Sequence, residues 1–351
     1  MFLSVENIAT LTSQKFISRE AFAKDYPVYP KHGDVLMTRI GDIGTSNVVE
    51  TDDKLAFYVS LALLKPFDVD SYYLDKSLQS PSAKEELYRR TLHIAFPKKI
   101  NKNQIAEVML PIPRSRQEQE QIGALFRDLD SLITLHQRKH DKLCTVKRSM
   151  LDKMFPKPGE TEPEIRFKGF TDPWEQRKLG ELCIISKGHG YSKADIRDAG
   201  TPLILYGRLY TQYESRIENV DTFAVEQEGS LLSKGNEVIV PASGETAEDI
   251  AVASSVRRSG IIFGGDLNVV TPVSKLDPDY IALAITYSKA HDDLAKRAQG
   301  KSVVHVHGND IAEVEIPYPS ESEQKRLSTV VLGLDSLITL HQREPRFADA
   351  G

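Results

Sequence analysis

The sequence contains few cysteines, no long hydrophobic run and no signal-peptide pattern in its first 16 residues. Its two cysteines, Cys144 and Cys183, have no histidine or cysteine at ligand spacing, which argues against a disulfide framework and a zinc site. No apolar run approaches the roughly 20 residues that span a bilayer, and residues 1–16 lack the basic, apolar and small-residue order of a leader. We therefore expect a cytoplasmic protein with free thiols.

An excess of positive charge is also missing. The formal net charge is -5, whereas a basic domain is the usual footprint of a nucleic-acid-binding protein. A local face of lysine and arginine could still bind DNA, because phosphate binding depends on the contacts made and not on the total charge. With 351 residues, of which 40% are hydrophobic, the chain is long enough for two soluble domains.

Motifs of catalysis are missing as well. The stretch from Asp277 to Tyr280 (DPDY) approaches a methyltransferase motif but has Asp279 where a second proline belongs, and no glycine-rich cofactor loop accompanies it. We interpret Asp277 as a helix N-cap. His305 and His307 would share one face of a strand, but no third metal ligand is evident, so DNA contact or a surface role is favoured. We predict no catalytic residue, no metal and no cofactor in this chain.

A ten-residue segment occurs twice. Residues 129–138 and 334–343 both read LDSLITLHQR, 205 positions apart. Ser115 followed by Glu118 predicts a capping box ahead of the first copy, and Ser320 followed by Glu323 predicts the same ahead of the second. A period this long exceeds that of a solenoid and indicates a duplicated module of one helix and one globular domain.

The apolar residues around both copies follow a heptad, which predicts that each helix carries a coiled-coil seam. The first helix should run from about Gln117 to Phe155, roughly 58 Å at 1.5 Å per residue. Polar seam residues such as His136 and His341 can fix the register. The expected pairing positions are Ile122, Leu125, Leu129, Leu132, His136, Leu143, Val146 and Met150 in the first helix, and Leu327, Val330, Leu334, Leu337 and His341 in the second.

The second helix is expected to be shorter than the first, because Pro345 interrupts it and the following residues carry no heptad. Two explanations stay open: the chain is a natural truncation or frame change, or another chain supplies the missing half. The expected order is a first globular module at 1–113, a first helix at 114–155, a linker at 156–173, a second module at 174–319, a second helix at 320–344 and a tail at 345–351.

The second module is predicted to be mixed, mostly β with one helix over 279–296. Its strand-like runs are 182–185, 202–205, 237–240, 250–253, 260–263 and 269–273. The first module has the same order in a shorter form, with residues 33–37 parallel to 235–240 and residues 70–77 in the place of the helix that starts near Asp277. The equivalent of residues 174–202 is absent ahead of Met1, so the first module is expected to lack its opening strand or two.

These junctions resemble the specificity subunit of type I restriction-modification systems. In that family two target-recognition domains alternate with two conserved helical regions, and Pro-x-Pro leads into a helix with a Glu-Gln pair and a Leu-Asp-x-Leu-Ile core. The matching segments here are PIPRSRQEQEQIGALFRDLDSLITLHQR, PYPSESEQKRLSTVVLGLDSLITLHQR, the domain opening PEIRFKGFTDPWEQRKLGEL and the domain exit GKSVVHVHGNDIAEVEIPYP. Both ends of the chain depart from the family pattern.

The resemblance implies an α+β, non-catalytic subunit that reads a bipartite double-stranded DNA target. Its two recognition domains would each read one half, while two long helices, paired as an antiparallel coiled coil, would set the spacing and dock two modification subunits. Those partners would hold S-adenosylmethionine and methylate adenine, and restriction subunits would join through them. The alternative is a truncated or recombined subunit that serves as a helical interaction scaffold without reading DNA.

The expected DNA-contacting residues lie in loops that combine glycine with hydroxyl, aromatic and basic side chains. Arginine and glutamine can read base edges, while lysine, serine and threonine mostly position phosphates. The alternative for each residue is a place in a solvated loop. The candidates are Arg39, Thr45, Ser46, Arg89 and Arg90 in the first module, and Lys187, His189, Tyr191, Ser192, Lys193, Tyr206, Arg208, Tyr210, Arg297, Gln299, Lys301, Ser302 and His305 in the second.

Overall fold

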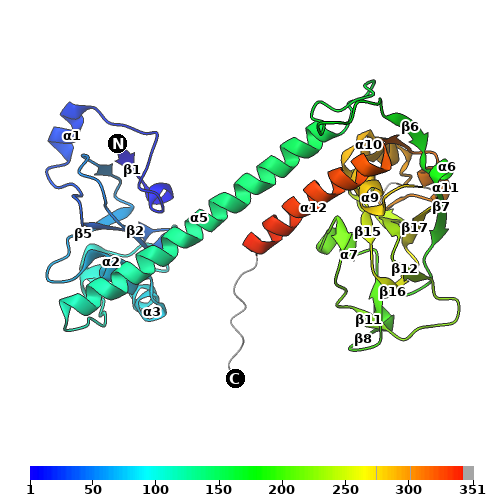
Figure 1. Cartoon of the computed structure of the whole chain (residues 1–351). Coiled ribbons are helices and arrows are strands. Elements are labelled where there is room, and N and C mark those ends of the chain that lie inside the picture. The colour runs from blue at the N-terminus through cyan, green and yellow to red at the C-terminus, as the bar shows by residue number, and fades with distance from the viewer. Residues whose placement is uncertain (274, 301, 343–351) are drawn as a thin grey trace. The chain divides into compact units, whose positions relative to one another are not determined.

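The computed structural model describes residues 1–273, 275–300 and 302–342 (Figure 1). The chain has an α+β fold and divides into two compact units, which meet between His136 and Gln137 within the long helix α5 (Arg116–Met154). None of the described helices is both long enough and apolar enough to cross a membrane. The predicted tail and Lys301 lie outside the described residues.

The first unit is built on a three-stranded antiparallel sheet with the strand order β3-β2-β5. Two helices, α2 and α3, pack on β3, and apolar residues of the sheet and of these helices share one core. Its elements ahead of α5 are β1 (Phe2–Leu3), α1 (Arg19–Asp25), β2 (Val35–Ile40), β3 (Asp42–Val48), β4 (Ala56–Phe57), β5 (Leu61–Leu64), α2 (Ser71–Gln79), α3 (Pro81–Arg89) and α4 (Lys102–Ala106).

The second unit contains two five-stranded sheets, ordered β10-β15-β13-β17-β7 and β12-β16-β9-β11-β8. Its strands are β6 (Glu175–Lys178), β7 (Cys183–Lys187), β8 (Ile196–Arg197), β9 (Thr201–Ile204), β10 (Arg216–Ile217), β11 (Phe223–Ala224), β12 (Leu232–Lys234), β13 (Glu237–Pro241), β14 (Ser243–Gly244), β15 (Ser254–Val256), β16 (Ser259–Phe263), β17 (Leu267–Pro272), β18 (Val304–His305) and β19 (Glu315–Tyr318). Its helices are α6 (Leu179–Leu182), α7 (Arg208–Thr211), α8 (Ala247–Ile250), α9 (Pro278–Tyr287), α10 (Lys289–Arg297), α11 (Gly308–Ala312) and α12 (Glu321–Gln342).

Two local predictions were wrong in the second unit. The run 250–253 is not a strand, because α8 ends at Ile250 after the Thr246 side chain accepts the Asp249 N–H at its start. The helix predicted over 279–296 is two helices, since extended backbone at Ser288 ends α9 and its hydroxyl caps α10. The apolar periodicity continues from α9 into α10, so it does not reveal the break, which depends on the single residue Ser288.

A hydrogen-bond network ties α9 to the start of α12. The Asp277 side chain accepts the Tyr280 N–H, which confirms the predicted N-cap, and the Asp277 N–H donates to Gln324 Oε1 at 2.9 Å. The Gln324 amide donates to Pro319 O at 2.8 Å, and Tyr280 Oη donates to Pro317 O at 2.8 Å. Backbone polar groups that would otherwise be buried without partners are satisfied in this way.

The first unit repeats this network at α2 and the start of α5. The Asp70 side chain accepts the Tyr73 N–H, and the Asp70 N–H donates to Gln119 Oε1 at 2.9 Å. The Gln119 amide donates to Pro113 O at 2.8 Å, and Tyr73 Oη donates to Pro111 O. The duplication detected from the sequence is therefore also a duplication of side-chain geometry.

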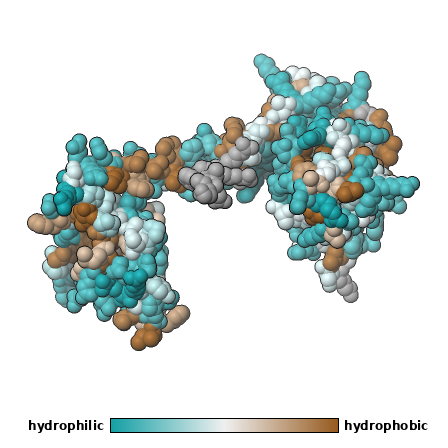
Figure 2. Space-filling model, turned by 90° about the horizontal axis from the view of Figure 1, so that it is seen from below, coloured by the Kyte–Doolittle hydropathy of each residue, from teal (hydrophilic) through white to brown (hydrophobic). Residues whose placement is uncertain are grey.

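The predicted helices are present, but the heptad residues differ in burial. Leu327 is 1% exposed and belongs to the core beneath α9, together with Val331, which the heptad does not include. Leu125, Leu129, Leu132 and Leu337 are all more than 40% exposed. Figure 2 shows hydrophobic surface along the part of α5 beside the first unit. Pairing between the two copies of LDSLITLHQR stays a prediction.

Candidate functional site

Three loops that the sequence places far apart meet at one end of the β13-β17-β7 sheet. Lys187 at the end of β7 pairs with Asn268 of β17, and the Asn268 amide donates to Val306 O at 3.0 Å. Strand β14 follows β13 and pairs with β18, so that Ser243 faces His305. Two of the predicted DNA-contacting groups, around residues 187 and 299–305, therefore share this edge of the sheet.

Hydrogen bonds connect the third predicted group to the same place. Tyr210 Oη donates to Ser243 O at 2.7 Å, and Ser243 Oγ lies 3.1 Å from His305 Nδ1. The Tyr206 ring packs against the Tyr210 ring with centroids 6.2 Å apart. Gln299 and His305 exchange two backbone hydrogen bonds. Tyr206, Tyr210, Ser243, Gln299 and His305 make up what we call the polar cluster.

The polar cluster carries hydrogen-bonding groups on its exposed side. Tyr206 and Tyr210 are each 38% exposed, and Gln299 and His305 are also exposed. Burial of the Tyr210 phenol, and secondarily the charge of Asp249, raise the pKa of Tyr210, so the hydroxyl stays protonated as a donor. Such groups are suited to base edges, whereas phosphate contacts come mainly from lysine and arginine.

Glycines allow the close approaches at this edge. Gly300 has a φ of +142°, and a Cβ at that position would lie 1.9 Å from Val303 O. A Cβ on Gly188 would lie 2.0 Å from Gly264 O. Side chains at either position would push apart the backbone segments that hold Gln299 and Lys187.

Two of the predicted DNA-contacting residues of the second module are largely buried and bonded to other parts of the module. Tyr191 is 5% exposed, and its hydroxyl accepts the Gln227 N–H at 2.7 Å. The Arg208 side chain is 11% exposed and forms ion pairs with Glu214 at 2.8 Å and Asp221 at 3.1 Å. These two side chains shape loops, and neither is free to read a base in this conformation.

The remaining predicted residues of that module lie around the polar cluster or on separate loops. Arg297 pairs with Asp293 at 3.2 Å, and Ser192 caps the short helix that begins at Lys193. Other exposed candidates are Lys187, His189 and Ser302.

In the first module, most of the predicted residues bond within the chain. Ser46 is 6% exposed and donates to Asp75 O, while Thr45 Oγ1 donates to Asp42 at 2.6 Å. Arg39 is half-buried on β2. Arg89 forms ion pairs with Glu85 and Glu86, and Arg90 with Glu86 and Glu107. No equivalent of the polar cluster forms among these five residues.

Sequence reasoning missed Ser243 and the residues that anchor the second module to α12. Ser243 lies in a Ser-Gly-Glu-Thr stretch directly after a strand, the same kind of signal that identified the other loops. Glu323 was identified only as a capping residue, but it is 2% exposed and accepts hydrogen bonds from Arg166 Nε at 2.8 Å and Trp174 Nε1 at 3.1 Å. The hydrogen bonds to Glu323 raise the pKa of Arg166.

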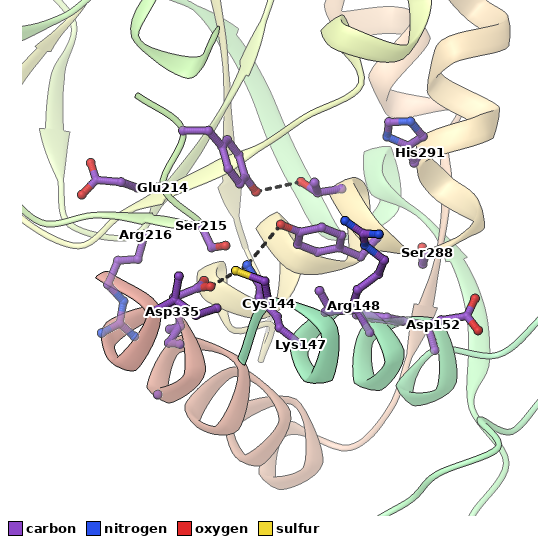
Figure 3. Close-up of a pocket in the computed structure, with 18 of the residues that line it drawn as sticks. Cys144, Lys147, Arg148, Asp152, Glu214, Ser215, Arg216, Ser288, His291 and Asp335 are labelled. Carbon is purple, nitrogen blue, oxygen red and sulfur yellow. Dashed lines mark hydrogen bonds and ion pairs between the residues drawn. The ribbon is translucent and has the colours of Figure 1, made fainter. Parts of the chain in front are cut away.

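A groove of about 1260 Å³ separates the second module from the adjoining halves of α5 and α12 (Figure 3). Lys147 reaches across it, with Nζ 2.5 Å from Asp335 Oδ1 and 3.4 Å from Tyr287 Oη. Burial raises the pKa values of Tyr287 and Tyr213 in its wall, so both phenols act as neutral hydrogen-bonding groups. The contacts of Lys147 join α5 to α12 and to α9 of the module. Across the described residues, no group of three or more His, Cys, Asp or Glu could hold a metal ion.

Comparison with known proteins decides the family. A family model described as "Type I restriction modification DNA specificity domain" matches residues 5–144 and 171–346. The chain belongs to this family. Each matched segment includes a globular module and most or all of the helix that follows it, in agreement with the duplicated network.

The relatives of this specificity-domain protein include two from Methanocaldococcus jannaschii. It is 20% identical over 257 residues to the type I restriction enzyme MjaVIII specificity subunit, which covers 70% of this chain and 59% of that protein. It is 23% identical over 331 residues to the putative type I restriction enzyme MjaX specificity subunit, covering 89% of this chain and 74% of that one. The chain thus spans less than two thirds of the length of the first relative.

Solved structures share the fold. The type I restriction-modification system S subunit from M. genitalium matches with a TM-score of 0.55 and 13% identity, covering 94% of this chain and 87% of that one. A chain from a structure titled for complex assembly and conformational transition of the type I R-M system matches with a TM-score of 0.50 and 14% identity, covering 97% and 84%.

Proposed function

We propose that this chain is the DNA-specificity subunit of a type I restriction-modification complex. It reads one half of a bipartite double-stranded DNA target with each globular module and performs no chemistry itself. Two modification subunits dock on its helices, hold S-adenosylmethionine and methylate adenine, and restriction subunits join through them. The complex acts in the cytoplasm.

The observation that carries this proposal is the duplicated network. Each module presents an Asp-capped helix to a glutamine in the first turn of a long helix, at Gln119 and at Gln324. Two readers fixed in the same way to two similar helices suit a target made of two half-sites, because helix geometry then sets the half-site spacing.

In the second module we propose the polar cluster as the base-reading surface. Its tyrosines, glutamine and histidine expose donors and acceptors at one edge of the sheet, with Lys187 at the same edge for a phosphate. The pairing of α5 with α12 through Leu129 and Leu334 is likewise proposed, as is the role of the remaining predicted loop residues in DNA contact.

The experiment is to co-express the chain with its modification subunit and map methylated adenines across the genome. The expected result is methylation at one bipartite sequence, and none when the chain is present without the modification subunit. Methyl transfer by the purified chain alone would overturn the assignment as a non-catalytic subunit.

A variant test addresses the polar cluster. Replacing Tyr206 and Gln299 together with alanine should weaken methylation at the native sites at least tenfold, since one good base contact contributes about 1–3 kcal/mol. Val225→Ala, an exposed neutral position of the same module, is the matched control. Unchanged site choice and rate in the double variant would remove the cluster from the reading surface.

A further inference from the structure

In the second module, one segment of the chain covers the apolar face next to the start of α12. Strand β6 pairs antiparallel with β19 over residues 315–318, and β7 pairs with the outer edge of β17 over residues 268–272. Trp174, just ahead of β6, is 3% exposed and bonds to Glu323. A single segment that begins near Arg166 and ends at Lys187 supplies the ion pair, the aromatic side chain and both strands.

The corresponding backbone edges of the first module are open among the residues described. Residues 109–112 correspond to β19 and form no strand, and β5 corresponds to β17 and is the edge of its sheet. Met109 is 77% exposed and Ile112 is 51% exposed. An edge with unpaired N–H and C=O groups is a template for another strand.

The apolar face next to these edges is also less buried than its counterpart. Five positions that are fully or almost fully buried in the second module are half-buried or exposed in the first. Phe126 is 44% exposed, whereas Val331 at the equivalent place is 0% exposed. The other pairs are Val108 with Val314, Leu110 with Ile316, Ile105 with Ile311, and Ile122 with Leu327.

An exposed carboxylate, that of Glu118, lies at the start of α5 beside these open edges. Glu118 precedes Gln119 as Glu323 precedes Gln324, so the two carboxylates hold equivalent positions in the two networks. Glu118 is exposed, and in the part of the chain described its carboxylate has no recorded hydrogen bond or ion pair. The second module satisfies this position with an arginine and a tryptophan.

We propose that residues 109–118 and β5 form a docking site for a strand-turn-strand partner segment of the same chemistry as residues 166–187. That segment carries an arginine and a tryptophan ahead of its first strand, as residues 166–187 do, and completes the first module by β-augmentation. A second copy of this chain does not suit the site, because its own segment is already held through β6 and the buried Trp174. The inference does not depend on DNA reading.

Hydrogen exchange of the full chain, measured by mass spectrometry without DNA, tests the proposal. The probe is a synthetic peptide with the sequence of residues 164–187, its cysteine replaced by serine, beside a scrambled peptide. In the chain alone, amides of residues 109–112 and 61–64 should exchange faster than those of 315–318 and 267–272. The peptide should slow exchange in the first pair of segments and leave the second pair unchanged.

Glu118→Gln supplies the decisive variant. It should weaken peptide binding by about tenfold or more, since a hydrogen bond to a charged group is lost. Glu120→Gln, the same change on the same helix two residues away, should leave binding intact.

Three results would overturn the proposal: slow exchange of 109–112 and 61–64 in the chain alone, no protection by the peptide, or protection that Glu118→Gln leaves unchanged. Protection that instead grows with the concentration of the chain would assign the site to a second copy.

Discussion

The two equivalent glutamates should differ sharply in their contribution to stability. Glu323→Ala removes one partner of a buried ion pair and leaves Arg166, 13% exposed at its side chain, without its carboxylate, while Trp174 loses its acceptor. Removing one member of such a pair costs about 3–5 kcal/mol. Because Arg166 keeps some contact with water, we expect a loss of about 3 kcal/mol in the free energy of unfolding, at the lower end of that range.

The assay is thermal unfolding followed by tryptophan fluorescence. Trp174 is the one tryptophan of the chain and lies in the second unit, so the signal reports the unit that Glu323 stabilises. For about 150–250 residues, each kcal/mol shifts Tm by about 2–4 °C, which gives a fall of about 6–12 °C.

Glu118→Ala is the internal control. Its carboxylate is exposed, so the change should alter the free energy of unfolding by no more than about 0.5 kcal/mol. Equal effects of the two substitutions, or a fall in Tm of less than about 2 °C for Glu323→Ala, would refute the argument. That argument is that burial of Glu323 by residues 166–187 causes the difference in stability.

Three further predictions concern the Cys183 thiol and the two aspartate N-caps. Burial raises the pKa of Cys183 to about 12, so a thiol reagent at pH 8 should label the half-buried Cys144 long before Cys183 in the native chain, and equal rates would contradict the buried environment. Since the folded pKa lies above the ordinary value, the contribution of the Cys183 thiol to stability should be present below about pH 9 and decline as pH rises toward 12, as urea unfolding at several pH values can check. Asp70→Ala and Asp277→Ala should each cost about 1 kcal/mol or more, because each removes an N-cap of equivalent geometry, and Asn at either position should restore most of it; a cost in one module alone, by denaturant unfolding, would contradict the repeated network.

Much of the local structure could be predicted from the sequence. The predictions that succeeded depend on patterns within a few residues. They are the N-cap at Asp277, the start and end of α5, and the alignment of residues 70–77 with the helix that starts near Asp277. The predictions failed where one cap outweighed a periodic pattern, at Thr246 and at Ser288. Propensity is a weak prior that a single hydrogen-bonding side chain can override.

The site was predicted only in pieces. Loops around Tyr210, Gln299 and His305 were selected separately, and Ser243 was missed, although its carbonyl and hydroxyl connect them. In the sequence, Arg208 and Tyr191 looked equally suitable for DNA contact. In the structure, Arg208 forms an ion pair with Glu214, and the Tyr191 hydroxyl forms a hydrogen bond with Ser230, 39 residues away. Residue type alone predicts neither that the loops of the polar cluster meet nor that these two side chains have partners within the fold.

The sequence by itself determined that this protein contains a module twice, because identical residues, equal Ser-x-x-Glu spacings and equal N-caps are local signals. Only the tertiary structure decided that the two copies are not in the same state. Glu118 and Glu323 follow the same cap in the same helix position, yet one is exposed and the other is 2% exposed. The physical reason is that burial depends on segments distant in the chain, here residues 166–187, which cover the second copy of the module.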